Sequence, residues 1–314
     1  MSTPADLHMF TGMLLPCPPF DFVKTLGFLH GFEPTGGEQV FVPGALTKAV
    51  TLHGRAVAFE LHSTGTIEKP ELVYTLYSEQ LLGETDSAAI ADRLRFFLSL
   101  DDDLRPFYDI GRADSSFAPV IERLYGLHHP KFLTPFEIAC WAILGQRVPW
   151  RVAHRTKLAL VERWGTSITL NGETYRAFPE AEQLAAMDMD ELASVVRNER
   201  KVEYLQAVIQ FFNEVDEQFL RYGDYDEVAA KIRGIRGIGE WSSYFIMARG
   251  LGRMERVSTI DQELAKAAAK VYNEGQLLAP SEMQRLLERY GEYQGFWSFY
   301  LRALLAASDD SMMA

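Results

Sequence analysis

Residues 233–264 read RGIRGIGEWSSYFIMARGLGRMERVSTIDQEL, and this stretch decides the fold of the 314-residue chain. Gly237 and Gly239 flank the aliphatic Ile238, so a tight turn with positive φ and close approach of a second backbone are both allowed. An apolar run at helical spacing follows from Glu240, so a helix should begin at the turn and present unpaired N–H groups in front of it. Such a turn suits a phosphate group. The same glycines also fit a plain cap that joins two core helices.

A lone acid, Asp261, stands at the start of the next expected helix, 20 residues after Trp241. One interpretation is structural, because Asp261 lies three residues after Ser258, and this spacing is typical of a capping arrangement that satisfies exposed helix amides. The other interpretation is catalytic, because a carboxylate beside a phosphate-binding turn suits hydrolytic chemistry. A carboxylate at a helix N-terminus can serve both purposes.

The charge of the chain is acidic overall but unevenly distributed. Lys and Arg number 31 against 43 Asp and Glu, a net charge of −12, although nucleic-acid binding rewards basic residues. Acidic residues gather in 101–109, 180–192 and 214–227, whereas basic residues gather in 146–157 and 231–256. We expect the two basic segments to face a polyanion. The alternative is that they form solvated helix faces.

Residues 233–264 resemble the helix-hairpin-helix and Gly/Pro-Asp signature of the base-excision DNA glycosylases, and they are most similar to the bacterial 3-methyladenine DNA glycosylase II branch. Further motifs in the family's order extend the resemblance over most of the chain, which makes it more specific than any single motif. These motifs are PCPPFDFVKTLGFL at 16–29, LSLDDDLRPFY at 98–108, TPFEIACWAILGQRV at 134–148 and FPEAEQLA at 178–185.

The resemblance implies roles for individual residues near the expected active site. Asp261 would be the catalytic carboxylate, because cleavage of an N-glycosidic bond develops positive charge on the sugar. Trp241 stands where glycosylases that also cut the backbone have a Schiff-base lysine, so the chain would be monofunctional. The resemblance places the base pocket at Trp241, Phe245, Phe296 and Phe28. The faces of such rings attract cationic alkylated purines, although aromatic residues at these spacings are also common in cores.

The resemblance also implies a DNA-binding set, which comprises Gln146, Arg147, Gly237, Ile238 and Gly239. Gln146 and Arg147 stand where the family places side chains that fill the gap left by a flipped nucleotide. Pro149 would fix the chain just beyond them, so both side chains would project from a short rigid loop. By the same resemblance, a monovalent cation would be held by the main-chain carbonyls of Arg233, Ile235 and Ile238.

Apart from that cation, the sequence indicates no cofactor. The two cysteines, Cys17 and Cys140, are too few for the four-cysteine iron–sulfur cluster of some related glycosylases and suggest a reducing compartment. The seven histidines form no zinc-binding pattern. No apolar run of about 18 residues and no signal peptide is visible, so we expect a cytoplasmic monomer associated with the bacterial nucleoid and not with a membrane. Its partner would be double-stranded DNA that contains damaged bases.

The expected fold class is an α+β N-terminal domain, 1–115, followed by an all-α helix-hairpin-helix core, 116–314. Alternation of apolar and polar residues over 9–80 predicts a small antiparallel sheet. From about Pro119 onward the apolar period is helical. The expected helices are 21–30, 88–100, 134–145, 150–164, 180–195, 199–217, 225–232, 240–251, 260–273, 280–290 and 295–307.

We therefore predict a monofunctional DNA glycosylase that flips and hydrolytically excises alkylated, 3-methyladenine-like bases in base-excision repair. One alternative is a glycosylase for an oxidised or deaminated base, and the other is a non-catalytic binder of DNA structures. The presence of Asp261 argues against the non-catalytic binder of DNA structures, because such a protein has no use for an acid facing DNA. The presence of Trp241 argues only against lyase activity. Departures from the family pattern at Arg147, Ile260 and 128–129 leave the range of lesions open.

Overall fold

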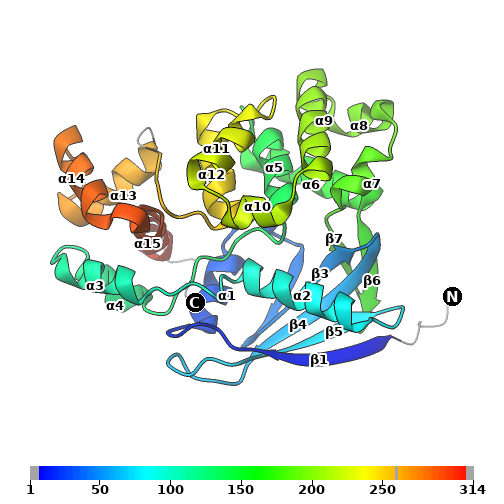
Figure 1. The fold of residues 1–314 in the computed structure, drawn as a ribbon, viewed down its shortest axis with the longest axis horizontal. Coiled ribbons are helices and arrows are strands. Elements are labelled where there is room, and N and C mark those ends of the chain that lie inside the picture. The colour runs from blue at the N-terminus through cyan, green and yellow to red at the C-terminus, as the bar shows by residue number, and fades with distance from the viewer. Residues whose placement is uncertain (1–6, 259–260, 309–314) are drawn as a thin grey trace.

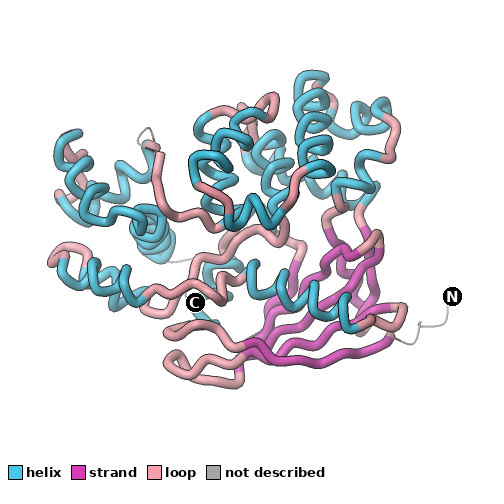
Figure 2. The backbone as a smooth tube through the Cα atoms, in the orientation of Figure 1, coloured by secondary structure: helices cyan, strands magenta, loops and turns pink. Residues whose placement is uncertain are grey.

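The computed structural model describes residues 7–258 and 261–308, so Ile260 lies outside the described residues. A five-stranded antiparallel sheet with two covering helices comes first in the chain, and a mostly helical core follows (Figure 1). The expected fold class is therefore confirmed. Figure 2 shows that the strands gather at one end of the molecule, below the helices.

The N-terminal sheet has the spatial order β1-β5-β4-β3-β2, and all of its neighbouring strands are antiparallel. Its strands are β1 (His8–Leu14), β2 (Gln39–Val42), β3 (Ala45–Leu52), β4 (Arg55–Ser63) and β5 (Leu72–Ser78). Alternate residues such as Leu46, Phe59 and Leu76 are fully buried on one face of the sheet. They pack in one hydrophobic cluster with α1 (Phe22–His30) and α2 (Glu84–Phe97).

The other face of the sheet is covered by a β-hairpin that the sequence analysis did not predict. Strands β6 (Thr166–Leu170) and β7 (Glu173–Ala177) pair around Asn171 and Gly172, which both have positive φ. This backbone is the one that a two-residue hairpin turn requires. Side chains of both strands pack with Ala58 of β4, so the hairpin supplies apolar cover that the helices do not.

The remaining helices form two groups, each with its own hydrophobic core. The first group comprises α5 (Pro135–Leu144), α6 (Trp150–Trp164), α7 (Ala181–Ala185), α8 (Met189–Val196), α9 (Glu199–Glu214), α10 (Glu217–Tyr222), α11 (Tyr225–Gly234) and α12 (Glu240–Leu251). The second comprises α3 (Arg105–Ala113), α4 (Ala118–Leu124), α13 (Gln262–Tyr272), α14 (Pro280–Tyr290) and α15 (Gln294–Ser308). The single helix expected at 180–195 is thus two helices, α7 and α8. No helix within residues 7–258 and 261–308 has the length and apolar character that a membrane span needs.

The domain boundary expected between residues 115 and 116 stays a prediction. Helix α3 precedes this boundary in the sequence, yet it packs with the C-terminal helices. The ring of Phe107 on α3 meets that of Tyr300 on α15 edge to face, with centroids 5.0 Å apart. The Tyr108 hydroxyl lies 2.9 Å from the Tyr300 hydroxyl.

Helix α5 lies at the centre of the first group, and all ten of its residues are buried. It begins where the Thr134 hydroxyl accepts a hydrogen bond from the Glu137 amide at 3.1 Å, with Pro135 in the first helical position. A helix that is apolar on nearly every side must lie in the core. Its contact with α12 is close, because a Cβ on Gly250 would lie 2.4 Å from Cγ2 of Ile138.

A buried network of charges joins the N-terminal sheet to α5. Lys157 of α6 is fully buried, and its Nζ lies 2.5 Å from a carboxylate oxygen of Glu137 and 2.5 Å from one of Glu38. Glu38 also pairs with Lys48 of β3 at 3.0 Å. Burial alone would raise the pKa of Glu38, but the two ammonium groups outweigh it and lower this pKa to about 2. Lys157, in the basic segment 146–157, therefore faces the interior and not a polyanion.

We predict that Glu38 makes folding stability depend on acid pH. Its ordinary pKa is 4.5 and its folded pKa is about 2, so its contribution is full well above pH 4.5 and is lost as the pH falls toward 2. Between about pH 7 and about pH 3 the wild-type free energy of unfolding should fall by about 2 kcal/mol more than that of Glu38→Gln. Urea unfolding at both pH values measures the difference. Glu263→Gln, at an exposed position, is the control, and a wild-type fall no larger than that of Glu38→Gln would contradict the prediction.

Candidate active site and nucleic-acid interface

The turn between α11 and α12 is tight and contains one left-handed glycine. Gly237 has φ = 95°, and a Cβ at this position would lie 2.3 Å from the ring of Tyr204. Gly239 has φ = −89°, so the expected positive φ is correct for Gly237 and wrong for Gly239. Between them, Ile238 is only 6% exposed and anchors the turn in the core of the first helical group.

Gly239 leaves the N-terminus of α12 open to a ligand. It is the N-cap residue, and no side chain caps this helix. A Cβ added to Gly239 would meet no described protein atom within 4 Å. The first amides of an uncapped helix and the positive end of its dipole both favour an anion. The geometry of this turn therefore suits a phosphate group that approaches at Gly239.

The loop after α5 supports the same turn. The side-chain amide of Gln146 donates a hydrogen bond to the Gly237 carbonyl at 2.7 Å. Gln146 therefore supports the α11–α12 turn. The sequence analysis expected its side chain to project from the loop beside that of Arg147, and it does not. Arg147 is exposed and has φ = 54°, a left-handed conformation that is uncommon for a residue with a side chain. Pro149 is the N-cap of α6 and limits the loop on its other side.

In the basic segment 231–256, some of the Lys and Arg side chains are buried or bound to other groups of the protein, and others are exposed to solvent. Arg249 is buried, the Arg253 guanidinium donates to the Gly223 carbonyl at 2.8 Å, and Arg256 pairs with a carboxylate of α11 at 2.7 Å. The exposed basic residues of the segment are Lys231, Arg233, Arg236 and Arg256. Arg236 also pairs with Glu203 of α9, at 2.7 Å, so Lys231 and Arg233 are the exposed residues outside these two ion pairs. Exposed positive charge therefore remains around the hairpin itself, where a phosphate backbone would approach.

Asp261 is itself the N-cap of α13, so the expected capping role is correct, but the expected arrangement with Ser258 is wrong, because the Ser258 hydroxyl has no hydrogen-bond partner among the described residues. Its Oδ1 accepts hydrogen bonds from the amides of Glu263 at 3.0 Å and Leu264 at 3.1 Å. Its Oδ2 lies 2.5 Å from a guanidinium nitrogen of Arg302 on α15. The carboxylate is thus held by two helices, and 13% of the side chain remains accessible. A fixed, partly accessible carboxylate is compatible with a catalytic role as well.

Two of the four expected pocket residues lie together on α12. The rings of Trp241 and Phe245 stack at a centroid distance of 5.2 Å and an interplanar angle of 10°. Trp241 is 48% exposed, so it is not a core residue. A stacked aromatic pair with one accessible face is a suitable platform for a nucleobase.

The other two expected pocket residues are not in ring contact with this pair, although Phe28 lies beside Arg249 of the same helix. Phe296 is 9% exposed in the core of the second helical group, where its nearest ring neighbour is Phe107 at 5.8 Å. Phe28 packs edge to face on Phe299 at 5.0 Å. Among the described residues, no ring contact joins Phe296 or Phe28 to Trp241. Phe299, one helical turn beyond Phe296, is the residue of α15 that meets Phe28, and the sequence analysis missed it.

Sequence reasoning also missed a buried polar pair beside Phe28. The guanidinium carbon of Arg249 lies 4.8 Å from the ring centre of Phe28 and 4.2 Å from that of Phe32. Arg249 Nη1 lies 3.0 Å from Nε2 of His129. Burial, and after it the charge of Arg302, lowers the pKa of Arg249 to about 9. The available signal was helical spacing, since residues 241, 245 and 249 of α12 follow one another at intervals of four.

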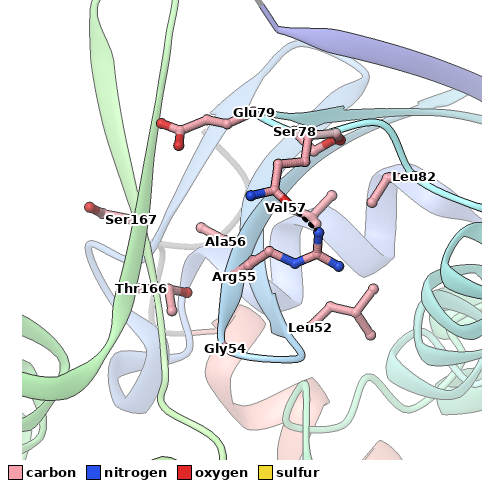
Figure 3. A pocket seen from close by; sticks show the side chains of 11 residues that line it. Leu52, Gly54, Arg55, Ala56, Val57, Ser78, Glu79, Leu82, Thr166 and Ser167 are labelled. Atoms are coloured by element: carbon pink, nitrogen blue, oxygen red, sulfur yellow. Dashed lines mark hydrogen bonds between the residues drawn. The ribbon is translucent and has the colours of Figure 1, made fainter. Parts of the chain in front are cut away.

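A pocket of about 300 Å³ lies apart from these residues, between the β3–β4 turn, the end of β5 and β6 (Figure 3). Arg55 crosses it and donates a hydrogen bond to the side chain of Gln80 at 2.5 Å. The pocket shares no lining residue with the α11–α12 turn, with Asp261 or with the aromatic residues of α12.

Comparison with known proteins gives matches over the whole architecture. Residues 140–292 match the family described as HhH-GPD superfamily base excision DNA repair protein. The chain is 28% identical over 211 residues to a DNA-3-methyladenine glycosylase of Bacillus subtilis, covering 67% of this chain and 70% of that protein.

Two solved structures show the same fold. A 3-methyladenine DNA glycosylase from Archaeoglobus fulgidus has a TM-score of 0.75 at 20% identity, over 94% of this chain and 98% of that one. An 8-oxoguanine glycosylase/lyase of Clostridium acetobutylicum, in complex with double-stranded DNA, has a TM-score of 0.66 at 15% identity, over 93% of both chains.

We predict that the two hairpin glycines differ in their effect on stability. Gly237→Ala should lower the free energy of unfolding by about 3 kcal/mol, because a Cβ collides with Tyr204 and disfavours the positive φ. Gly239→Ala should change it by less than about 1 kcal/mol, because its φ is ordinary and the Cβ has room. Urea unfolding of both variants tests the contrast, which equal losses would contradict.

Proposed function

Because residues 140–292 match the HhH-GPD superfamily of base excision DNA repair proteins, we propose that this chain is a monofunctional DNA glycosylase. It flips a damaged base out of double-stranded DNA and releases the base by hydrolysis. Alkylated bases of the 3-methyladenine kind are the proposed substrates, and the name of the Bacillus subtilis relative supports this choice. The observation that carries the proposal is Asp261, a carboxylate held in place by two helices while part of it stays accessible.

In the proposed reaction, the bond between sugar C1′ and the base nitrogen breaks, and its electron pair leaves with the base. The sugar gains oxocarbenium character, which the carboxylate of Asp261 stabilises. A water molecule then adds its oxygen to C1′ and gives up a proton, which leaves an abasic site. Arg302 is a positioning residue, because its contact with Oδ2 fixes the plane of the carboxylate.

The proximity of Asp261 to α12 supports one shared site. Burial raises the pKa of the Tyr244 hydroxyl on α12, and the negative charge of Asp261 is among the groups that raise it further. The same helix carries Trp241 and Phe245 and starts at the hairpin. In this proposal the hairpin binds phosphate, the aromatic pair receives the extruded base, and Asp261 lies close enough to act on the sugar.

A monovalent cation at the hairpin is part of the proposal. The carbonyls of Arg233, Ile235 and Ile238 lie at the end of α11 and in the turn, and the negative end of a helix dipole favours a cation. The Ile235 carbonyl also accepts a hydrogen bond from the Ile238 amide at 3.0 Å, which holds the turn in shape. Oxygen ligands of this kind fit the ion, and its charge would add to the phosphate site.

Trp241 distinguishes this proposal from a glycosylase with lyase activity. A lyase of that type forms a Schiff base between a lysine amine and the sugar, and an indole ring cannot form one. A glycosylase for an oxidised or a deaminated base would differ from this proposal in the lesion that it removes. It would use Asp261 in the same way. A non-catalytic binder of DNA structures would need the hairpin but not this carboxylate.

We predict that Asp261→Asn abolishes most base release while the fold is retained. Asparagine is also a good N-cap, so the substitution removes the charge without removing the cap. Loss of one aligned electrostatic group should slow release by a factor of about 100 or more. Single-turnover release from a lesion duplex measures the rate, and Asp226→Asn, at an exposed position on α11, is the control.

The same samples test the reaction type. Wild-type protein should leave an intact abasic strand, and borohydride should trap no covalent adduct between protein and DNA. Release by Asp261→Asn at the wild-type rate would refute the role of the carboxylate. A trapped adduct would show that a lysine serves as nucleophile.

We predict that Arg147 acts as a wedge during flipping. Arg147→Ala should slow excision of a base in a stable pair more than excision from a mismatch, where unstacking is already cheap. Its exposed, left-handed position between Gln146 and Pro149 supports this role. Release rates for a paired and a mismatched lesion at several salt concentrations test it. Equal losses on both substrates, with a salt slope lower by about one unit, would make Arg147 a phosphate contact instead.

A further inference from the structure

Strand β1 has a free edge that carries exposed apolar side chains. It is the outermost strand of its sheet, so it pairs with β5 on one side and with no described strand on the other. Met9 is 66% exposed, Phe10 40%, Met13 58% and Leu15, just beyond the strand, 59%. The backbone N–H and C=O groups of such an edge can pair with a further strand. The edge therefore offers both hydrogen-bonding groups and apolar surface.

Strand β1 lacks the features that usually protect an edge strand, which are short length, charged side chains, proline or a bulge. His8–Leu14 is seven residues long, contains no Asp, Glu, Lys, Arg or Pro, and pairs with β5 without a bulge. The opposite edge strand, β2, has only four residues, and the ion pair between Glu38 and Lys48 lies beside it. Addition of a strand is therefore expected at β1 and not at β2.

The face of the sheet that bears Met9 and Met13 is open near this edge. These two residues lie opposite Tyr77 and Val73 of β5, on the same face of the sheet as Ala58 of β4. The β6–β7 hairpin covers this face at β3 and β4. The two methionines lie beyond the hairpin and stay in contact with solvent.

The sequence of β1 is complementary to itself in an antiparallel pair. A twofold axis at Thr11, the central residue of His8–Leu14, lets all seven residues of one copy pair with those of another. Met9 then lies opposite Met13 of the second copy, and Thr11 lies opposite its own counterpart. Opposed side chains in such a pair lie about 5 Å apart, and apolar and Thr–Thr pairs at this distance stabilise a sheet.

The other face of the strand is complementary in size. In the same register Phe10 lies opposite Gly12 of the second copy, which has no side chain. A Cβ on Gly12 would lie 2.4 Å from Cζ of Tyr74, so the Tyr74 ring covers this glycine. The Phe10 ring already lies 6.2 Å from the Tyr74 ring of its own chain. Each Tyr74 would therefore meet a Phe10 ring from both copies.

The charge and the area of the edge both fit a second copy of this chain. Each chain has a net charge of −12, but β1 carries none of the acidic residues, so no carboxylates of the strand oppose one another. A strand without Lys or Arg is also no site for a phosphate backbone. A fully exposed large apolar side chain presents roughly 200 Å², so the four exposed residues leave about 400 Å² open per copy. Together with the edge backbone, two copies would bury about 1,200 Å², which is the low end for specific interfaces.

We propose that β1 pairs antiparallel with β1 of a second copy, with the twofold axis at Thr11, to form one sheet of ten strands, five from each copy. The dimer replaces the monomer that the sequence analysis expected, and it does not depend on the proposed glycosylase activity. Strand β1 lies at the lower edge of the molecule, whereas α11 and α12 lie in its upper half (Figure 1). The α11–α12 turn of each copy therefore stays open to DNA.

Sedimentation velocity of the full chain, between about 1 µM and about 200 µM, tests the proposal, because an interface of this size should associate in the micromolar range. Wild type should change from one chain to two over this range. Met9→Lys combined with Met13→Lys places like charges opposite each other twice across the twofold axis, so this variant should stay monomeric. Met9→Lys combined with Met13→Glu places opposite charges there and keeps the net charge at −12. It should dimerise at least about tenfold more tightly than the double lysine variant.

The control is Val40→Lys on the other edge strand, at a side chain that is 42% exposed, and it should dimerise like wild type. Three results would overturn the inference. Wild type that stays monomeric at about 200 µM would leave the edge to another protein or to solvent. A dimer that persists in the double lysine variant would lie at another surface. Equal association of the two charge variants would show that the strands do not pair in this register. Because positions 9 and 13 are exposed, both variants should keep the wild-type melting temperature, and the wild-type result decides alone if one does not fold.

Discussion

The buried ammonium of Lys157 is the contact on which the arrangement of the two parts of the chain depends. It binds Glu38 next to the N-terminal sheet and Glu137 on α5, both at 2.5 Å. A buried charge is tolerated only with its partners in place, so this network fixes how the sheet sits on the helical core. The loop at the far end of α5 holds the Gly237 carbonyl through Gln146. One fully buried helix thus connects the sheet to the turn between α11 and α12.

The candidate site is divided between two helical groups. Helix α12 of the first group carries Trp241, Phe245 and Arg249, while α13 and α15 of the second carry Asp261 and Arg302. In the proposed mechanism, base excision needs both contributions, because binding at the turn would position the DNA and the carboxylate would act on the sugar. A hairpin without the second group would bind DNA without chemistry. Ala248 of α12 packs against the core of the second group, and the charges of Asp261 and Arg302 act on Tyr244 and Arg249 of the same helix.

The sequence predicted those structural features that depend on residues close together in the chain. The hairpin, the start of α12 and the cap at Asp261 follow from a few contiguous positions. The β6–β7 hairpin was missed although Asn171-Gly172 between alternating residues is a known turn signal, because the helical periodicity around it dominated. Burial of Lys157 was not predictable from charge, since Glu38 lies 119 residues away in the chain. Helical spacing indicated that Arg249 shares a face with Trp241 and Phe245, but only tertiary packing reveals the rings that cover it.

The most direct measurement of the central claim is base release by the wild-type protein from a panel of duplexes, each with one alkylated, oxidised or deaminated base. Alkali after the reaction cleaves the strand wherever an abasic site was left. The account predicts alkali-dependent cleavage at the lesion for at least one alkylated base, and no cleavage before alkali is added. Intact strands for every lesion after alkali, in the presence of tight binding to the same duplexes, would contradict it.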